Sequence, residues 1–387
     1  AFLKEVLPLL VILLLGVFFR FYGINWDENF HLHPDERFLT MVETSIAPVD
    51  SLAEYFNTSQ SSLNPHNVLD ANGNSIFPFF VYGTYPIILV RYIAEWLGMT
   101  GYNEVHIIGR YLSGLFDTGT IVVVYLISKE LQQKKWLPYL AALFYACAIL
   151  PIQISHFFIV DNFATFFSAL AVFFAVRIQK FEEGKHLSKN EQEFHNAFIN
   201  YWDGFKLYAL FAIMVGLAAA SKINTIVIAA LLPVAVFFKK DDWPKDLSNF
   251  KWKLRFRNLF LAGVICILVF RIFQPYAFSG PGFFGILPNP KWIANLQELS
   301  FISSGESNYP PSIQWARRSF WFPIKNMIVW GLGLPIGILS IGGLIWIAVK
   351  LIKGENREFT LLWFFTFLYL VWQAMRWNPT MRYFLII

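Results

Sequence analysis

The chain has 387 residues, of which 56% are hydrophobic, 19% aromatic and only 15% charged, and its formal net charge at pH 7 is +5. This composition excludes an ordinary soluble domain, and several nearly charge-free runs approach the ~20 residues that a helix needs to cross a bilayer. A transmembrane β-barrel would instead show short alternating segments. We therefore predict an all-α polytopic membrane protein.

The apolar runs predict about ten transmembrane helices in a single domain, residues 1–387. The first run, residues 5–19, is followed by aromatic residues and no small-residue cleavage site, so we interpret it as a retained span. A second span begins at Arg110. The remaining runs cover residues 137–152, 157–176, 207–220, 223–238, 258–270, 327–349 and 359–373. Because the sequence starts at Ala and stops within the apolar run RYFLII, we expect a C-terminal part to follow it.

Basic residues orient the predicted spans. Most of the 31 Lys and Arg lie in four polar segments, namely 129–136, 177–206, 239–257 and 350–357. The positive-inside bias predicts that these segments and the N-terminus are cytoplasmic, with 181–200 as a polar loop. Residues 20–104 and 276–322 then become large external loops. Within the first, the Pro, Gly and aromatic content of residues 76–97 predicts interfacial helices rather than a span.

The net charge and the two cysteines argue against a nucleic acid partner, a disulfide and a thiolate metal site. Cys147 and Cys266 both lie in apolar runs, which argues against a disulfide or a thiolate metal site. Because the basic residues gather in particular loops, we attribute the charge of +5 to membrane orientation and expect no nucleic acid partner.

Ionisable residues gather on the predicted outer side, near the membrane boundary. Such groups are costly at membrane depth and mark functional candidates. They are Asp27, Glu28, His31, His33, Asp35 and Glu36 after the first span, Arg110 in the second, Asp161 near the outer end of the fourth, Lys222 in a turn between two half-spans, and Arg382 at the last span.

Structural roles remain open for these residues. A carboxylate after a first helix is commonly solvated, and Lys or Arg near helix ends commonly reaches the lipid headgroups. Asp117 is expected to form a structural ion pair or to be a hydrogen-bonded buried acid. His31 and His33 alternate with Asp35, but such a spacing converges on one metal ion only in a strand, which this region does not resemble. A metal site at His33 and Asp35 stays an alternative to no metal.

Several motifs together resemble the lipid-carrier-dependent glycosyltransferases of the glycosyltransferase C superfamily, which include protein O-mannosyltransferases and aminoarabinose transferases. The acidic pair in HPDERF after the first helix resembles their first external loop. The other matches, in chain order, are SIFPFFVYGTYP, GRYLSGLFDTGT, SHFFIVDNFATFF, SKINT and MRYFLII. SKINT differs in lacking an aromatic residue directly after Lys222.

The resemblance implies an integral membrane glycosyltransferase in the cell membrane, with its active site facing outside. Its donor would be a polyprenyl-phosphate-linked sugar among the membrane lipids, and its acceptor a hydroxyl on a protein or lipid. The leaving phosphate needs cations, for which Arg110, Lys222 and Arg382 are the candidates. Inverting transfer needs one carboxylate base.

The catalytic candidates are Asp35 as this base, Glu36 holding the loop, and Asp161 orienting the acceptor or stabilising positive charge on the sugar. Asp27 belongs to a competing acidic pair, which we expect to be a solvated loop entry. Three alternatives stay open. They are a transporter or lipid flippase, a non-catalytic structural subunit, and metal-dependent oligosaccharyl transfer with a divalent ion at His33, Asp35 or Asp161.

Overall fold

Helices make up nearly all the regular structure of the chain. The computed structural model describes residues 2–131, 134–181, 191–237 and 249–386. These described residues contain only two isolated β-bridges, at Leu69–Ser75 and Phe278–Pro288. The predicted all-α class is confirmed.

Five described helices are long and apolar enough to cross a membrane, and a sixth span is made if one bent pair counts as a single crossing. The five are α5 (Tyr102–Leu131), α8 (Asp161–Lys180), Gly204–Ser221 of α9 (Glu191–Ser221), Leu254–Phe273 of α11 (Asn249–Phe273) and α15 (Leu334–Ile352). The bent pair is α6 (Leu137–Cys147) and α7 (Ile149–Ser155), which meet at 54°. The chain is a multi-pass membrane protein, but the predicted count of about ten spans is not confirmed.

The count differs because several apolar runs form shorter helices. The run at 223–238 is divided into the 3₁₀ helix η2 (Ile223–Ala230) and α10 (Leu231–Phe237). The first run lies in α1 (Phe2–Phe21), whose apolar part is also below span length. Conversely, α9 begins at Glu191, inside the segment predicted as a polar loop. Residues 182–190 and 238–248 of the predicted cytoplasmic segments lie outside the described residues.

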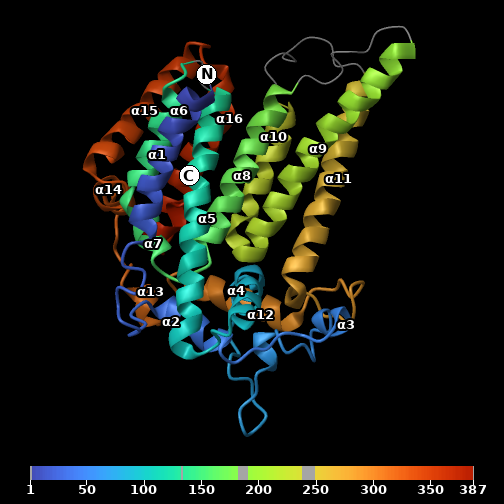
Figure 1. Ribbon diagram of the computed structural model, residues 1–387, viewed down its shortest axis with the longest axis vertical. Helices are drawn as coiled ribbons and strands as arrows, with labels where there is room; N and C mark the ends of the chain where they lie inside the picture. The colour runs from blue at the N-terminus through green and yellow to red at the C-terminus, as the bar shows by residue number, and fades with distance from the viewer. Residues whose placement is uncertain (1, 132–133, 182–190, 238–248, 387) are drawn as a thin grey trace.

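Short helices form a layer across one end of the bundle (Figure 1). This layer contains α2 (Pro34–Glu43), α3 (Leu52–Tyr55), α4 (Thr84–Leu97), α12 (Pro290–Ile302) and α13 (Pro310–Ile313). The N-terminal end of α1 and the C-terminal end of α5 lie at the opposite end (Figure 1). The two predicted external segments therefore share one end of the molecule, here called the helical cap. The chain continues through α14 (Trp321–Asn326), α15 and α16 (Thr360–Ala374) to η6 (Met381–Phe384).

The helical cap has its own apolar core. Leu39 and Val42 of α2 and Val90 of α4 are fully buried, together with Phe77 and Phe80 of the connecting segment. Burying each such side chain contributes about 1.5–3 kcal/mol. This core fixes α2 and α4 against the start of α5, so the ends of the first external segment cannot move freely over the bundle.

Local sequence explains where α2 begins. His33 is its N-cap, and His33 Nδ1 accepts hydrogen bonds from the backbone N–H groups of Asp35 (3.2 Å) and Glu36 (3.4 Å). Pro34 occupies the first turn, where its missing N–H costs nothing, and both acids stabilise the positive end of the helix dipole. The concentration of ionisable residues in HPDERF is thus also a helix-start signal.

A buried ion pair joins the first spans. Arg20 Nε donates to Asp117 Oδ2 at 2.5 Å, and the Tyr145 hydroxyl donates to Asp117 Oδ1 at 2.7 Å. Both side chains of the pair are fully buried. The structural ion pair predicted for Asp117 is confirmed, with Arg20 as its partner. It ties α1, α5 and α6 together.

Candidate active site

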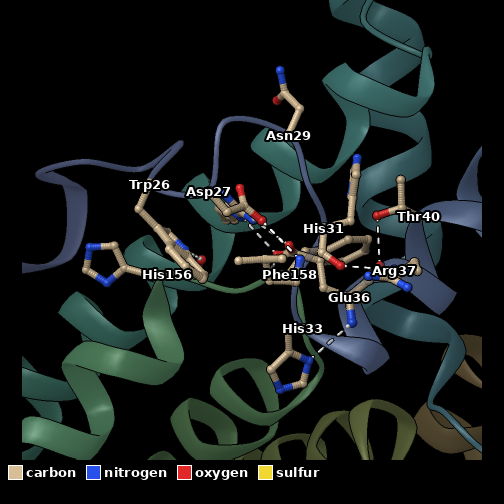
Figure 2. Close-up of polar contacts among 12 residues, drawn as sticks. Trp26, Asp27, Asn29, His31, His33, Glu36, Arg37, Thr40, His156 and Phe158 are labelled. Carbon is tan, nitrogen blue, oxygen red and sulfur yellow. Dashed lines mark hydrogen bonds and ion pairs between the residues drawn. The ribbon is translucent and has the colours of Figure 1, made fainter.

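The most buried ionic group at the helical cap is a triad of Arg110, Glu36 and Asp27. Figure 2 shows its two acids, Asp27 and Glu36. Arg110 Nε donates to Glu36 Oε2 at 2.9 Å, and Arg110 Nη2 donates to Glu36 Oε1 at 2.5 Å and to Asp27 Oδ2 at 2.9 Å. The remaining Nη1 donates to the Ile24 carbonyl at 2.9 Å. All three side chains are fully buried. All three guanidinium nitrogens donate to protein acceptors.

A glycine allows the triad to reach a fourth segment. The Phe158 N–H donates to Glu36 Oε2 at 2.6 Å. A Cβ on Gly109 would lie 2.2 Å from the Phe158 ring, so only glycine lets α5 approach this closely. Glu36 therefore links α2, α5 and the segment before α8, which agrees with its expected loop-holding position.

Asp27 differs from the sequence prediction. It was expected to be a solvated loop entry, but it is 4% exposed and paired with Arg110. Burial alone would raise the pKa of Asp27, yet the hydrogen bond and charge of Arg110 lower it below its ordinary value. The sequence does not reveal this ion pair, because Asp27 and Arg110 are 83 positions apart along the chain.

A second group lies beside the triad and consists of two carboxylate–cation pairs. Asp35 of α2 pairs with Arg382 of η6 through Oδ2 and Nη1. Asp161, the first residue of α8, pairs with Lys222 through Oδ1 and Nζ at 2.6 Å. The two pairs lie close enough to interact, because the charge of Arg382 acts on both carboxylates, Asp35 and Asp161. Four of the predicted site residues are thus brought together.

Aromatic rings complete this second group. The Lys222 ammonium lies 4.5 Å from the centre of the Tyr383 ring, a cation–π distance. The aromatic residue missing after Lys222 in the sequence is therefore supplied by η6. On the other side, Gly83 donates to the Ser221 carbonyl at 3.2 Å, and a Cβ there would lie 2.1 Å from the Ala220 oxygen. This contact brings the SIFPFFVYGTYP segment to the lysine turn.

The electrostatics favour an ionised Asp35. Burial alone would raise the pKa of Asp35, but the adjacent Arg382 charge and hydrogen bond, with His33 and Lys222, hold it below its ordinary value. Burial lowers the pKa of His33, against the opposing charge of Asp35. Burial and the charge of Asp35 raise the pKa of Tyr82 well above its ordinary value. Asp35 is thus an anion whose basicity is limited by Arg382.

Two neighbouring hollows lie in this region. A narrow cleft, here called the cationic cleft because three cations line it, has Asp161, Lys222, Asn224, Trp372, Arg376, Arg382 and Tyr383 among its lining residues. A larger cavity of about 440 Å³ is lined mainly by apolar side chains of α5, α6, α8, α15 and α16. The hollows share Thr165 and Ile386 in their linings.

The residues of this region do not fit a divalent metal. His33 Nδ1 is used as the cap of α2, and Figure 2 shows this ring apart from the triad. Asp35 faces the positive charge of Arg382. His31 instead lies 3.3 Å from Asn103 through Nε2 and packs on His106. Over the ranges that the structure describes, no three His, Cys, Asp or Glu side chains are placed to hold a metal ion.

The predicted residues therefore divide between two neighbouring groups. Arg110 and Glu36 belong to the triad. Asp161, Lys222 and Arg382 line the cleft, and Asp35 is joined to it through its pair with Arg382. Sequence reasoning did not find Tyr82, Tyr383 or Arg376. The aromatic character of the segment containing Tyr82 and of MRYF was a signal for two of them. Arg376 gave none.

Comparisons with known proteins agree with this architecture. Residues 98–274 match the family model of dolichyl-phosphate-mannose-protein mannosyltransferases. These residues include Arg110, Asp161 and Lys222. No curated protein matches the sequence.

Three solved structures are similar to the chain. The Archaeoglobus fulgidus oligosaccharyltransferase tethered to an acceptor peptide with the NVT sequon is 14% identical, with TM-score 0.63, covering 99% of this chain and 48% of that one. The same enzyme with Zn and sulfate is 14% identical, with TM-score 0.56, covering 98% and 47%. The S. cerevisiae protein O-mannosyltransferase Pmt1–Pmt2 complex bound to its sugar donor is 17% identical, with TM-score 0.48, covering 72% and 35%.

The chain spans about half the length of the oligosaccharyltransferase chains that it matches. The fold is shared over almost all of this chain, and the family match covers the spans that carry three of the predicted site residues. The predicted resemblance to the lipid-carrier-dependent glycosyltransferases of the glycosyltransferase C superfamily is confirmed.

Proposed function

We propose that this protein transfers a sugar from a polyprenyl-phosphate carrier to an acceptor hydroxyl of a protein or lipid, with inversion. The observation that carries the proposal is the cationic cleft, with its two carboxylate–cation pairs, beside a larger apolar cavity. The mannosyltransferase family match supports the same class of donor.

The carrier phosphate would enter the cleft beside Lys222 and Arg382. Both cations are paired with carboxylates. A phosphate has more acceptor oxygens than either carboxylate and can draw both cations to itself. The apolar cavity would take part of the prenyl chain. Cations aimed at the leaving oxygen stabilise the negative charge that grows there in the transition state.

Asp35 would act as the general base. When the phosphate takes Arg382, Asp35 loses the partner that holds its pKa low, and its basicity rises. The acceptor oxygen then forms a bond to the anomeric carbon while its proton passes to Asp35. The bond between that carbon and the phosphate oxygen breaks, and its electron pair leaves with the phosphate. Donor binding thereby prepares the base.

Asp161 and Arg110 receive different roles. Asp161, released from Lys222 by the phosphate, would orient the acceptor or stabilise positive charge on the sugar ring. The expectation that Arg110 binds the carrier phosphate is replaced, because every part of its guanidinium is engaged and buried. We assign Arg110 and Glu36 to positioning α2, so that Asp35 faces the cleft.

The site would face the outside of the cell membrane. The helical cap contains both segments that the basic residues predict to be external, and Asp35 lies in this cap. Outside the cell there are no nucleotide sugars, so a lipid-linked donor is the consistent choice.

A transfer assay tests the proposal. The full-length protein in lipid nanodiscs is incubated with a radiolabelled polyprenyl-phosphate sugar and a hydroxyl-bearing acceptor peptide. We expect labelled product with inverted anomeric configuration, and at least a hundredfold loss in Asp35→Asn. Transfer with retained configuration would contradict the single-step mechanism. Full transfer by Asp35→Asn would remove Asp35 as the base.

A further inference from the structure

Arg376 is a cleft cation that differs from the other two. It lies just after α16 and lines the cationic cleft together with Lys222 and Arg382. Those two form ion pairs, whereas Arg376 forms none with any residue that the structure describes. Its guanidinium lies 5.0 Å from the centre of the Trp372 ring, and no hydrogen bond joins it to a residue that the structure describes. It is half-buried.

The charges of the cleft need this third cation. Lys222 and Arg382 are balanced by Asp161 and Asp35, so that the two pairs together are neutral. Arg376 makes the group positive by one charge. A phosphate that links a sugar to a prenyl chain is a diester and carries one negative charge. The donor would therefore be neutralised by the cation that has no internal partner.

The same balance holds after transfer. The released carrier is a phosphate monoester, whose charge at pH 7 approaches −2 because its second pKa is about 6. At that moment Asp35 has taken the acceptor's proton and has lost its negative charge. The group is then positive by two charges, which again matches the phosphate. Without Arg376, an uncompensated negative charge would stay in a partly desolvated cleft at both stages.

We infer that Arg376 binds the phosphate of a lipid phosphate in the cationic cleft, and that this phosphate belongs to the prenyl carrier. The inference rests on the proposed function and adds a binding residue to it. A structural role, in which Arg376 only stacks on Trp372, is the competing explanation. A phospholipid headgroup would offer the same phosphate chemistry from a different source.

Arg318 provides a matched control for the structural role. Its guanidinium lies 4.7 Å from the centre of the Phe322 ring, and it too forms no ion pair with a described residue. It is exposed and does not line the cationic cleft. Arg318→Gln thus removes an arginine–aromatic contact and one positive charge without touching the cleft.

Binding is measured for the full-length protein in nanodiscs with three probes, namely polyprenyl phosphate, unphosphorylated polyprenol and phosphatidic acid. We expect Arg376→Gln to weaken polyprenyl phosphate binding about tenfold or more, as loss of a charge-assisted hydrogen bond does. Polyprenol binding should not change, which also shows that the variant is folded. Arg376→Lys should restore part of the loss, and Arg318→Gln should bind like the parent protein.

Other outcomes separate the two proposals. Parent-like binding of polyprenyl phosphate by Arg376→Gln would overturn the role of Arg376 alone. Equal displacement by phosphatidic acid would assign the site to bulk phospholipid and overturn the carrier as the source. If Arg376→Gln loses phosphate binding while the parent protein transfers no sugar, the binding role stands and the proposed transferase fails. A parent protein that binds polyprenol and polyprenyl phosphate equally would overturn both.

Discussion

Asp35 and Glu36 are adjacent in the sequence, yet each carboxylate meets a different arginine. Glu36 accepts two hydrogen bonds from the buried Arg110, while Asp35 pairs with Arg382 at the cleft. The first turn of α2 directs successive side chains about 100° apart around the helix axis. One acid therefore anchors the loop and the other reaches the proposed site.

Because Asp35 and Glu36 have different partners, we predict that Asp35→Asn affects the transfer rate and Glu36→Gln affects stability. Asp35→Asn should reduce the transfer rate by about 10²–10⁴-fold, because a general base is lost, while the unfolding temperature changes little. Glu36→Gln should lower the unfolding temperature, because it weakens a buried pair with Arg110 and the contact from Phe158. Initial rates and thermal unfolding of the same preparations distinguish the two. An equal loss of stability in both variants would contradict the division of roles.

Asp27→Asn is predicted to act on stability and not on chemistry. The substitution removes a charge from the buried partner set of Arg110, but Glu36 still neutralises the guanidinium. We expect a loss of about 1–3 kcal/mol, less than for a fully broken buried pair. Denaturant unfolding in mild detergent measures it, with the exposed Asp50→Asn as the control. Unchanged stability together with a lost transfer rate would make Asp27 the competing catalytic acid.

The sequence predicted the all-α membrane class because this class depends on local patterns. Apolar runs reveal a membrane chain, whereas the start of α2 within HPDERF was not predicted, because we treated this stretch as loop. Partners distant along the chain were not predictable. Arg20 pairs with Asp117 across 97 positions and Asp35 with Arg382 across 347. The predicted number of spans is not confirmed for a similar reason, since hydropathy does not show that residues 137–155 bend by 54°.

Gly109→Ala should separate α5 from the Phe158 segment. The added Cβ would lie 2.2 Å from the Phe158 ring, so the backbone must shift and lengthen the hydrogen bond from Phe158 to Glu36. We expect a loss of about 1–3 kcal/mol in unfolding free energy. Gly263→Ala in α11 is the control, because its Cβ would meet no atom within 4 Å. Equal stability of the two variants would show that the contact is looser than described.

Membrane sidedness can be tested with single cysteines. After Cys147 and Cys266 are replaced by alanine, Asn72→Cys in the helical cap and Lys353→Cys after α15 are introduced separately; both native side chains are exposed. An impermeant maleimide added to intact cells should label only the Asn72 position. Labelling of both positions after cell lysis shows that each thiol is reactive. The reverse pattern in intact cells would place the cleft on the cytoplasmic side and remove the argument for a lipid-linked donor.

Removal of Arg382 should shift the pH dependence of transfer. Burial favours a raised pKa for Asp35, and Arg382 is the first opposing influence that lowers it. Arg382→Gln therefore raises this pKa. Because a base works only when deprotonated, the fall in rate on acidification should begin at a higher pH than in the parent protein. The readout is kcat/KM for the donor, which reports ionisations of the free enzyme. Arg376→Gln serves as the control, because Arg376 is not one of the leading influences on the pKa of Asp35. Arg376→Gln should lower kcat/KM, but the pH at which kcat/KM begins to fall on acidification should not change. If the fall in kcat/KM begins at the same pH in Arg382→Gln as in the parent protein, the titrating base is another group. Asp161 is then the next candidate, because it is the second carboxylate on which the charge of Arg382 acts.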